Sequence, residues 1–307
     1  MDIFIQQIIN GVTLGSVYAV VALGYTMVYG IIQLINFAHG ELVMIGAMVA
    51  FSVIGALAPS GLPPAVLLAA AAACAIPVCM ALGYGMERAA YRPLRGAPRL
   101  APLITAIGVS IILQHVAMMI WSRNPLAFPQ LVASRSWPVA GATITTVQIG
   151  VIGVSVVMMA GLAFLIYRTR LGTAMRATAQ NAQVAGLMGI DANRIVALTF
   201  MIGAGLAAVA GIMVASYYGI AHYPMGAGLG LKAFCAAVLG GIGNVPGAMV
   251  GGLLLGVVEA LGAGYIGDFT NNFFGSNYQD VFAFLVLILV LVFRPSGLLG
   301  ERVGDRA

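Results

Sequence analysis

The chain has 307 residues, of which 61% are hydrophobic and only 7% are charged. Soluble domains carry roughly 25% charged residues, so this composition excludes an ordinary soluble protein. The net charge of +5 comes almost entirely from arginine, and in a membrane protein such an excess reports orientation, not nucleic-acid binding. Apolar runs long enough to span a bilayer recur along the chain. We predict an all-α integral membrane protein, a polytopic bundle of about 8–10 transmembrane helices with broken or re-entrant segments. It forms a single domain over residues 1–307.

The first two apolar runs differ in character. Ile8–Tyr29 predicts a membrane helix rich in small residues, which let helices approach closely in lipid. Ile31–Leu57 is interrupted at Asn36–Glu41, where a histidine and a glutamate flank a glycine. Because ionisable groups are costly in hydrocarbon, we expect a broken or re-entrant helix that lines a polar cavity. The alternative is an interfacial junction between two short helices.

Arginines set the orientation of the next segments. Ala65–Met86 predicts a span, and the loop Glu87–Leu100 that follows it is the densest basic loop, which places it in the cytoplasm. Ala101–Trp121 crosses the membrane again. The polar segment Ser122–Thr146 then lies on the opposite side, and Val147–Tyr167 returns to the cytoplasm.

Arg168–Arg194 is a long interior segment that is not membrane-like. Loops between membrane helices are normally short, so a polar segment of this length calls for a role. Its part from Ala174 to Met188 consists largely of good helix formers and contains no proline, which predicts one short helix. One interpretation is a solvated cytoplasmic loop whose arginines only set topology. The other is a docking helix through which a second protein pushes on the membrane helices.

The second half contains another interruption. After Ile195–Tyr218, a glycine-rich irregular region precedes Leu231–Leu239, which is too short to span alone. Two short segments joined at Gly240–Gly247 would cross twice, which gives about nine segments in total. The remaining ranges are an apolar run, a polar loop on the outer side and a last span: Ala248–Tyr265, Gly264–Gln279 and Asp280–Phe293. Paired interruptions in two halves indicate an internal repeat with a transport pathway between its halves.

Motifs for several enzyme classes are absent. The lone lysine, Lys232, has no phosphate-binding loop around it, so we expect this chain not to hydrolyse ATP. Three scattered histidines predict no metal site. A membrane serine protease would need Ser110 or Ser155 with His115 or His222, but such tripeptides are expected by chance in a glycine-rich chain. We expect no catalytic residues.

Ionisable residues within the apolar runs remain as functional candidates. Each also has a structural interpretation: His39 as a helix-end residue, Lys232 as a side chain reaching the interface, and Glu259 as a hydrogen-bonding partner between helices. The candidates for the transport path are His39, Glu41, Lys232 and Glu259.

Three stretches together resemble one family. INFAHGELVMIGA, GLMGIDANRIVALTFMIGAGLAAVAGIM and LKAFCAAVLGGIGNVPGAMVGGLLLGVVEAL are similar to the inner-membrane permease of branched-chain amino acid ATP-binding-cassette importers (the LivH type). The resemblance covers almost the whole chain. It implies a multi-pass protein of the bacterial inner membrane with several partners: a second homologous permease, two ATPase subunits that bind the ATP, and a periplasmic substrate-binding protein.

The resemblance also implies roles for residues. In such permeases the loop corresponding to 168–194 docks the ATPase, which makes its helix residues the coupling candidates. These are Met175, Arg176, Asn181, Ala185, Leu187, Gly189 and Ile190. Asn36 and Asn244, which lie within the two interruptions, are also candidates for the transport path. The rival hypothesis is a self-sufficient, proton-coupled secondary transporter that uses Glu41 or Glu259 as a proton relay.

Overall fold

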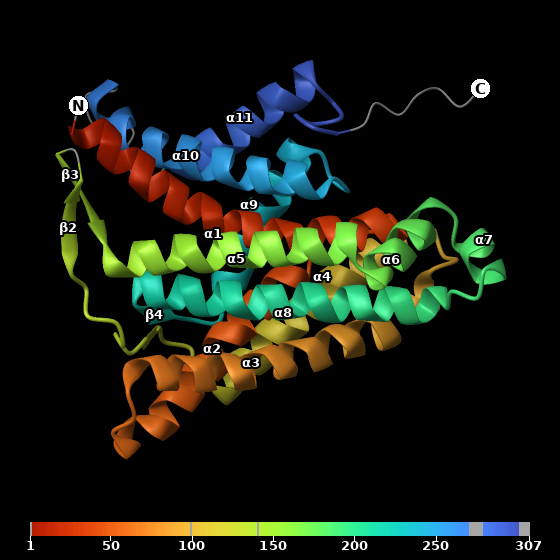
Figure 1. Ribbon diagram of the computed structural model, residues 1–307, viewed down its shortest axis with the longest axis horizontal. Coiled ribbons are helices and arrows are strands. Elements are labelled where there is room, and N and C mark those ends of the chain that lie inside the picture. The colour runs from red at the N-terminus through yellow and green to blue at the C-terminus, as the bar shows by residue number, and fades with distance from the viewer. Residues whose placement is uncertain (1, 99, 140, 270–278, 301–307) are drawn as a thin grey trace.

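The computed structural model describes residues 2–98, 100–139, 141–269 and 279–300, and within these ranges it is predominantly helical (Figure 1). Among the described residues, seven helices are long and apolar enough to cross a membrane, and two shorter apolar helices accompany them. This confirms the all-α polytopic membrane fold. The main helices are α1 Asp2–Ile32, α2 His39–Leu57, α3 Pro64–Met86, α4 Leu100–Ile120, α5 Thr146–Arg168, α6 Arg170–Gln180, α7 Ala182–Leu187, α8 Ala192–Tyr218, α9 Met225–Gly240, α10 Val245–Phe269 and α11 Gln279–Phe293.

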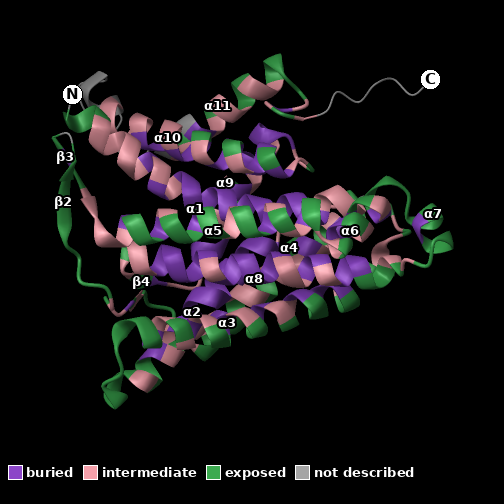
Figure 2. Ribbon diagram, viewed as in Figure 1, coloured by how far each residue is buried: buried purple, intermediate pink, exposed green. Residues whose placement is uncertain are grey.

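Helices α1 and α8 form the centre of the bundle. In Figure 2 their ribbons are mostly buried, whereas α3, α5 and the end loops show many exposed residues. Small residues explain how α1 is enclosed. Gly11 and Gly15 lie against the backbone of α10 at Leu253 and Val257, where a Cβ atom would overlap main-chain atoms. In lipid, where apolar surface is not expelled from water, such close backbone approach is a main source of helix association.

The predicted interruption in the first half is present, but it lies between two helices. Residues 33–38 are not helical, and Gln33 has a positive φ of 57°. Ile31 and Ile32 belong to α1, and His39 begins α2. The prediction that Ile31–Leu57 forms one interrupted segment was therefore wrong. The first helix is also longer at both ends than Ile8–Tyr29.

The second half is more helical than predicted. The glycine-rich stretch from Gly226 was expected to be irregular, but it forms the first turns of α9. Backbone packing explains the difference. Gly226 and Gly230 lie against Gly40 at the start of α2, where larger side chains would not fit. The interruption that remains is the short loop 241–244 between α9 and α10.

The polar segment between α4 and α5 contains short strands. β2 (Ser136–Val139) and β3 (Ala142–Thr145) pair antiparallel, and β1 (Leu126–Ala127) pairs with β4 (Ile220–Ala221) after α8. The amide of Thr143 donates to Gln6 Oε1 at 2.9 Å, which fixes the start of α1 beside this hairpin. The described arginines other than Arg123 and Arg135 lie at the opposite ends of the helices. The positive-inside rule therefore assigns the hairpin and the start of α1 to the outer side.

Candidate functional site

The segment 168–194 folds as two helices and not as the single helix predicted for Ala174–Met188. Thr169 caps α6 by accepting from the Gly172 amide at 3.1 Å. Asn181 ends α6 and caps α7, with its Oδ1 accepting from the amides of Gln183 and Val184 at 3.0 Å each. An asparagine that offers its side chain to the backbone in this way favours a helix start over a helix interior. Figure 1 shows α6 and α7 together at one end of the bundle.

The predicted coupling residues divide into buried and exposed groups. Met175 and Ala185 are each only 4% exposed, so they pack within this chain. Leu187 is 87% exposed, and the neighbouring Met188 is 80% exposed. Large apolar side chains this exposed, on the arginine-bearing side of the bundle, form an apolar surface that we call the α7 tip, made of Val184, Leu187 and Met188.

Local geometry holds the α7 tip in place. Gly189 has a φ of 84°, a left-handed conformation that favours glycine after a helix end. The amide of Ile190 then donates to the Ala185 carbonyl at 3.0 Å. Arg176 of α6 lies over the Tyr167 ring, 5.8 Å from its centroid, and donates to the Ile166 carbonyl at the end of α5. The segment is therefore tied to α5 on one side and leads directly into α8 on the other.

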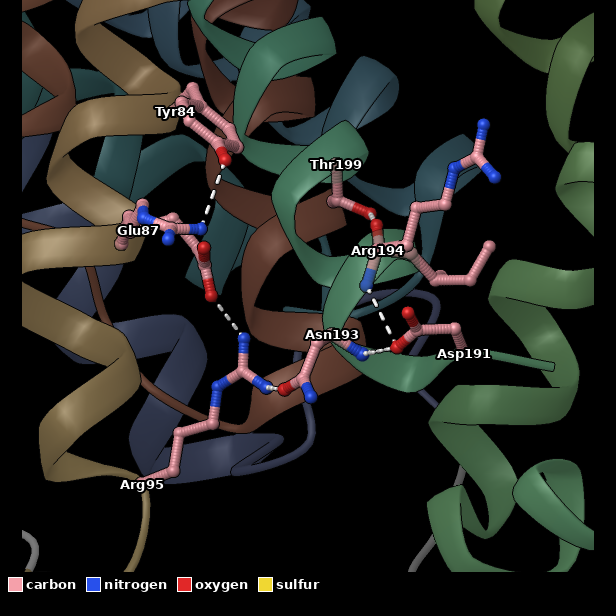
Figure 3. Close-up of polar contacts among 9 residues, drawn as sticks. Tyr84, Glu87, Arg95, Asp191, Asn193, Arg194 and Thr199 are labelled. Atoms are coloured by element: carbon pink, nitrogen blue, oxygen red, sulfur yellow. Dashed lines mark hydrogen bonds and ion pairs between the residues drawn. The ribbon is translucent and has the colours of Figure 1, made fainter.

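A polar cluster joins the start of α8 to the end of α3 (Figure 3). Asp191 caps α8 by accepting from the amides of Asn193 and Arg194 at 2.9 and 3.3 Å. Arg95 donates to Asn193 Oδ1 at 2.5 Å and forms an ion pair with Glu87, which is 1% exposed. A cavity of about 360 Å³ opens beside these residues. This cluster was missed in the sequence, since its members are brought together only by packing of α3 against α8.

The residues Asn36, His39 and Glu41 are buried at the interruption between α1 and α2. Asn36 accepts from the Tyr91 hydroxyl at 2.8 Å, whereas the His39 ring packs against Tyr25 with centroids 4.8 Å apart. The imidazole lies between Gly24 of α1 and Gly203 of α8. These contacts place Asn36 and His39 against different helices, so the three residues do not share one set of neighbours.

Glu41 is completely buried and contacts two further helices. Its Oε1 accepts from Ser110 at 2.9 Å and from Gln114 Nε2 at 2.8 Å, both on α4. Its Oε2 lies beside Gly226 of α9 and has no hydrogen-bond partner among the described residues. Asn36 Nδ2 and His39 Nε2 are likewise unpaired within that part of the chain. Buried polar atoms without partners are uncommon, so these three atoms mark the interruption as unusual within the apolar bundle.

Lys232 and Glu259 form an ion pair between α9 and α10, with Nζ and Oε1 2.7 Å apart. Lys232 Nζ also lies 2.7 Å from Asp280 Oδ1 at the start of α11. These charges therefore link three helices. Asn244 accepts from the Gly247 amide at 3.1 Å and donates to the Leu299 carbonyl at 2.7 Å, which ties the loop before α10 to the segment after α11.

Comparisons with known proteins identify the family. A family model described as "Branched-chain amino acid transport system / permease component" matches residues 7–291. The permease protein BraD of the high-affinity branched-chain amino acid transport system of Pseudomonas aeruginosa is 51% identical, covering 97% of this chain and 96% of BraD. The corresponding LivH of Escherichia coli K12 is 47% identical with the same coverage. PsaBC from Streptococcus pneumoniae, solved in complex with Fab, aligns with a TM-score of 0.45 at 14% identity, too weak a likeness to add to this. The chain belongs to the family of branched-chain amino acid transport system permease components.

Proposed function

We propose that this chain is the membrane-spanning permease subunit of an ATP-binding-cassette importer for branched-chain amino acids. The observation that carries the proposal is the near full-length similarity to BraD and LivH, at 51% and 47% identity, since both are permease proteins of such a transport system. The bundle of apolar helices with buried, unpaired polar atoms at an interruption supports the same function. The proposal assigns no cofactor to this chain itself.

The partners in the proposal are a second homologous permease, two ATPase subunits that bind and hydrolyse ATP, and a periplasmic binding protein that delivers the solute. The complex would lie in the bacterial inner membrane. Two features support this division of labour. The sequence has no phosphate-binding loop, which agrees with ATP hydrolysis on separate subunits. The α7 tip offers an exposed apolar surface on the side assigned to the cytoplasm, as an ATPase contact requires.

Coupling would then proceed from α7 into the bundle. A displacement of the α7 tip is transmitted to α8 directly through Ile190 and the Asp191 cap. The Asn193–Arg95–Glu87 contacts carry it to the end of α3, and Arg176 carries it to the end of α5. Because α8 also contacts His39 through Gly203, displacement of α8 alters the surroundings of the interruption between α1 and α2.

The path residues in the proposal are those around the two interruptions. Asn36, His39 and Glu41 have unpaired atoms that a passing solute can use. Lys232 and Glu259 hold α9 against α10, and Asn244 fixes the loop between those helices. Asn36, His39 and Glu41 thus contact the solute. Lys232, Glu259 and Asn244 stabilise the structure around the second interruption.

The test is purification of the tagged chain from its native membrane, followed by reconstitution into liposomes. We expect two nucleotide-binding subunits and a second permease to accompany it, and leucine uptake to require both ATP and the binding protein. Transport by the chain alone, without ATP and abolished by Glu41→Gln, would contradict the importer and support the proton-coupled transporter.

A further inference from the structure

Two adjoining cavities open at the outer ends of α1, α3, α5 and α8, on the side away from the α7 tip. Each has a volume of about 510 Å³, within the range of roughly 300–1,000 Å³ that is usual for small-molecule sites. They share three lining residues, Gln130, Val147 and Ser216, so the two cavities are direct neighbours. We refer to them as the polar cavity and the apolar cavity.

The polar cavity is lined mainly by amides and hydroxyls, and none of the described residues that line it is charged. Gln148, which is 4% exposed, fixes its wall, because its Nε2 donates to Asn10 Oδ1 at 3.0 Å and its Oε1 accepts from the Thr145 amide at 2.8 Å. An uncharged site with fixed hydrogen-bonding groups suits a solute of zero net charge better than an ion, since a desolvated ion needs an opposite charge. The polar lining residues are Gln6, Asn10, Gln130, Ser134, Thr143, Thr145, Gln148, Ser216, Tyr217 and Tyr218.

The apolar cavity lies further along α5 and α8, between these helices and α3. Its wall is mainly aliphatic, with Leu68 from α3, Val151 and Val154 from α5, and Val209 and Ile212 from α8. Transfer of an aliphatic side chain from water into this cavity would contribute a binding free energy of roughly 25 cal/mol per Å² of apolar surface buried. The succession from polar to apolar lining therefore matches a molecule with a zwitterionic end and a branched hydrocarbon end.

We propose that the two cavities together form an outer receiving site of the permease, which binds the amino acid before it enters the bundle. The ammonium and carboxylate groups occupy the polar cavity, and the aliphatic side chain occupies the apolar cavity. This inference rests on the proposed function, and it adds a side-chain preference of the permease itself to the selection made by the binding protein.

Gly150 offers a direct test because it lines the apolar cavity and none of the described atoms lies within 4 Å of where its Cβ atom would be. Gly150→Leu therefore fills the cavity without a backbone clash. Gly153→Leu is the matched control, since Gly153 is on the same helix, has equally open surroundings and does not line the cavity. Val154→Ala makes the opposite change by enlarging the cavity.

The measurement is ATP-dependent uptake of leucine and of alanine by the intact importer in liposomes. The same binding protein serves every variant, so its own preference cancels when ratios are compared. We expect Gly150→Leu to lower the leucine-to-alanine ratio by about ten-fold or more, as for a filled aliphatic pocket. Gly153→Leu should keep the original ratio. Val154→Ala should raise uptake of phenylalanine relative to leucine, an outcome that loss of folding cannot imitate.

Unchanged ratios in both cavity variants would overturn the inference. So would an equal loss of all solutes in Gly150→Leu with no change of preference in Val154→Ala, since that pattern fits a groove filled by a lipid chain. In either case the unaltered importer would still transport, so the proposed function would stand. Absence of ATP-dependent uptake by the unaltered importer would instead remove the proposed function.

Discussion

A charged lysine within a membrane bundle is tolerated only when a group of opposite charge lies nearby. Lys232 meets this condition through Glu259, whose side chain is only 2% exposed, and through Asp280, whose side chain is 50% exposed. The two carboxylates are therefore not equivalent. Asp280 can turn to solvent when the lysine is lost, whereas Glu259 would remain as a buried charge.

Lys232→Ala should consequently destabilise the chain strongly. Leaving one member of a buried ion pair unpaired costs roughly 3–5 kcal/mol, whereas replacing both members by apolar side chains is often neutral. We expect a large fall in the thermal unfolding midpoint in detergent for the single variant. The double variant Lys232→Met with Glu259→Leu should recover most of it. Equal losses in the single and double variants would show that Glu259 is not the group left unpaired.

The sequence identifies the charged residues within the apolar runs but not the side chains that they contact. Glu41, Lys232 and Glu259 stand out because they interrupt apolar runs. The Lys232–Glu259 pair joins different helices, so it follows only from the packing of α9 on α10. Ser110 was considered only as a nucleophile, yet it donates to Glu41. One signal was available: Ser110 and Gln114 are four residues apart, which places two polar groups on one face of an apolar helix.

Helix α2 packs on α8 through glycines. A Cβ atom on Gly46 would lie 2.5 Å from Ala208 Cα, which is closer than real side chains approach a backbone. The Cβ position of Gly55, nine residues further along the same helix, has none of the described atoms within 4 Å. The two glycines therefore separate the effect of helix packing from the general cost of glycine in a helix.

We predict opposite results for alanine at these two positions. Alanine favours a helix by roughly 1 kcal/mol over glycine, so Gly55→Ala should be neutral or slightly stabilising. Gly46→Ala should lower stability in spite of this gain, because α2 and α8 must move apart. The thermal unfolding midpoint of the purified chain is the measurement. A stabilising effect at Gly46 would show that α2 and α8 do not touch there.

The segment of α6 and α7 shows how far local rules reach. Its helical nature was predictable from composition, but the division at Asn181 was missed. Asparagine is among the preferred residues at helix starts, and at Asn181 its side chain accepts from two backbone amides. The burial of Met175 and Ala185 could not be read from the sequence, since it depends on how the segment folds back onto the bundle.

The exposed α7 tip gives the coupling proposal its sharpest test. Leu187→Ser combined with Met188→Ser should leave folding intact, because both side chains are at least 80% exposed. We expect the amount of ATPase recovered with the tagged chain to fall by ten-fold or more, as for the loss of an interface hot spot of roughly 2 kcal/mol. Leu62→Ser, which changes a 40% exposed leucine beyond α2, is the control. Undiminished ATPase recovery would place the docking surface elsewhere.

For the whole molecule, hydropathy predicted most of the architecture, because spanning helices need long apolar runs. The start of α1 could not be oriented from sequence, since the interruption at Asn36 left the number of crossings open. The contact of Gln6 with Thr143 resolves this by fixing that end beside the β2–β3 hairpin. The apolar cavity was also beyond prediction, because its wall combines residues 129–132 with residues of α3, α5 and α8.

Labelling of single added cysteines tests the orientation. Ser134 lies exposed on the side assigned to the periplasm, and Gly186 lies exposed in α7 on the other side. We expect Ser134→Cys to react with a membrane-impermeant maleimide on intact spheroplasts, and Gly186→Cys to react only after permeabilisation. The unaltered chain gives the background from Cys74, Cys79 and Cys235. The reverse pattern would invert the proposed coupling and receiving sides.

The close packing of α1 on α10 through its glycines also has a consequence for biosynthesis. Gly11 and Gly15 pack against residues 252–260 of α10, near the other end of the chain. Synthesis proceeds at roughly 5–20 residues per second, so α1 waits about ten to fifty seconds in the bilayer before α10 emerges. During that interval its small-residue face is open to other helices. Assembly of this permease is therefore completed late, and the newly inserted first helix is the part most in need of protection from premature pairing.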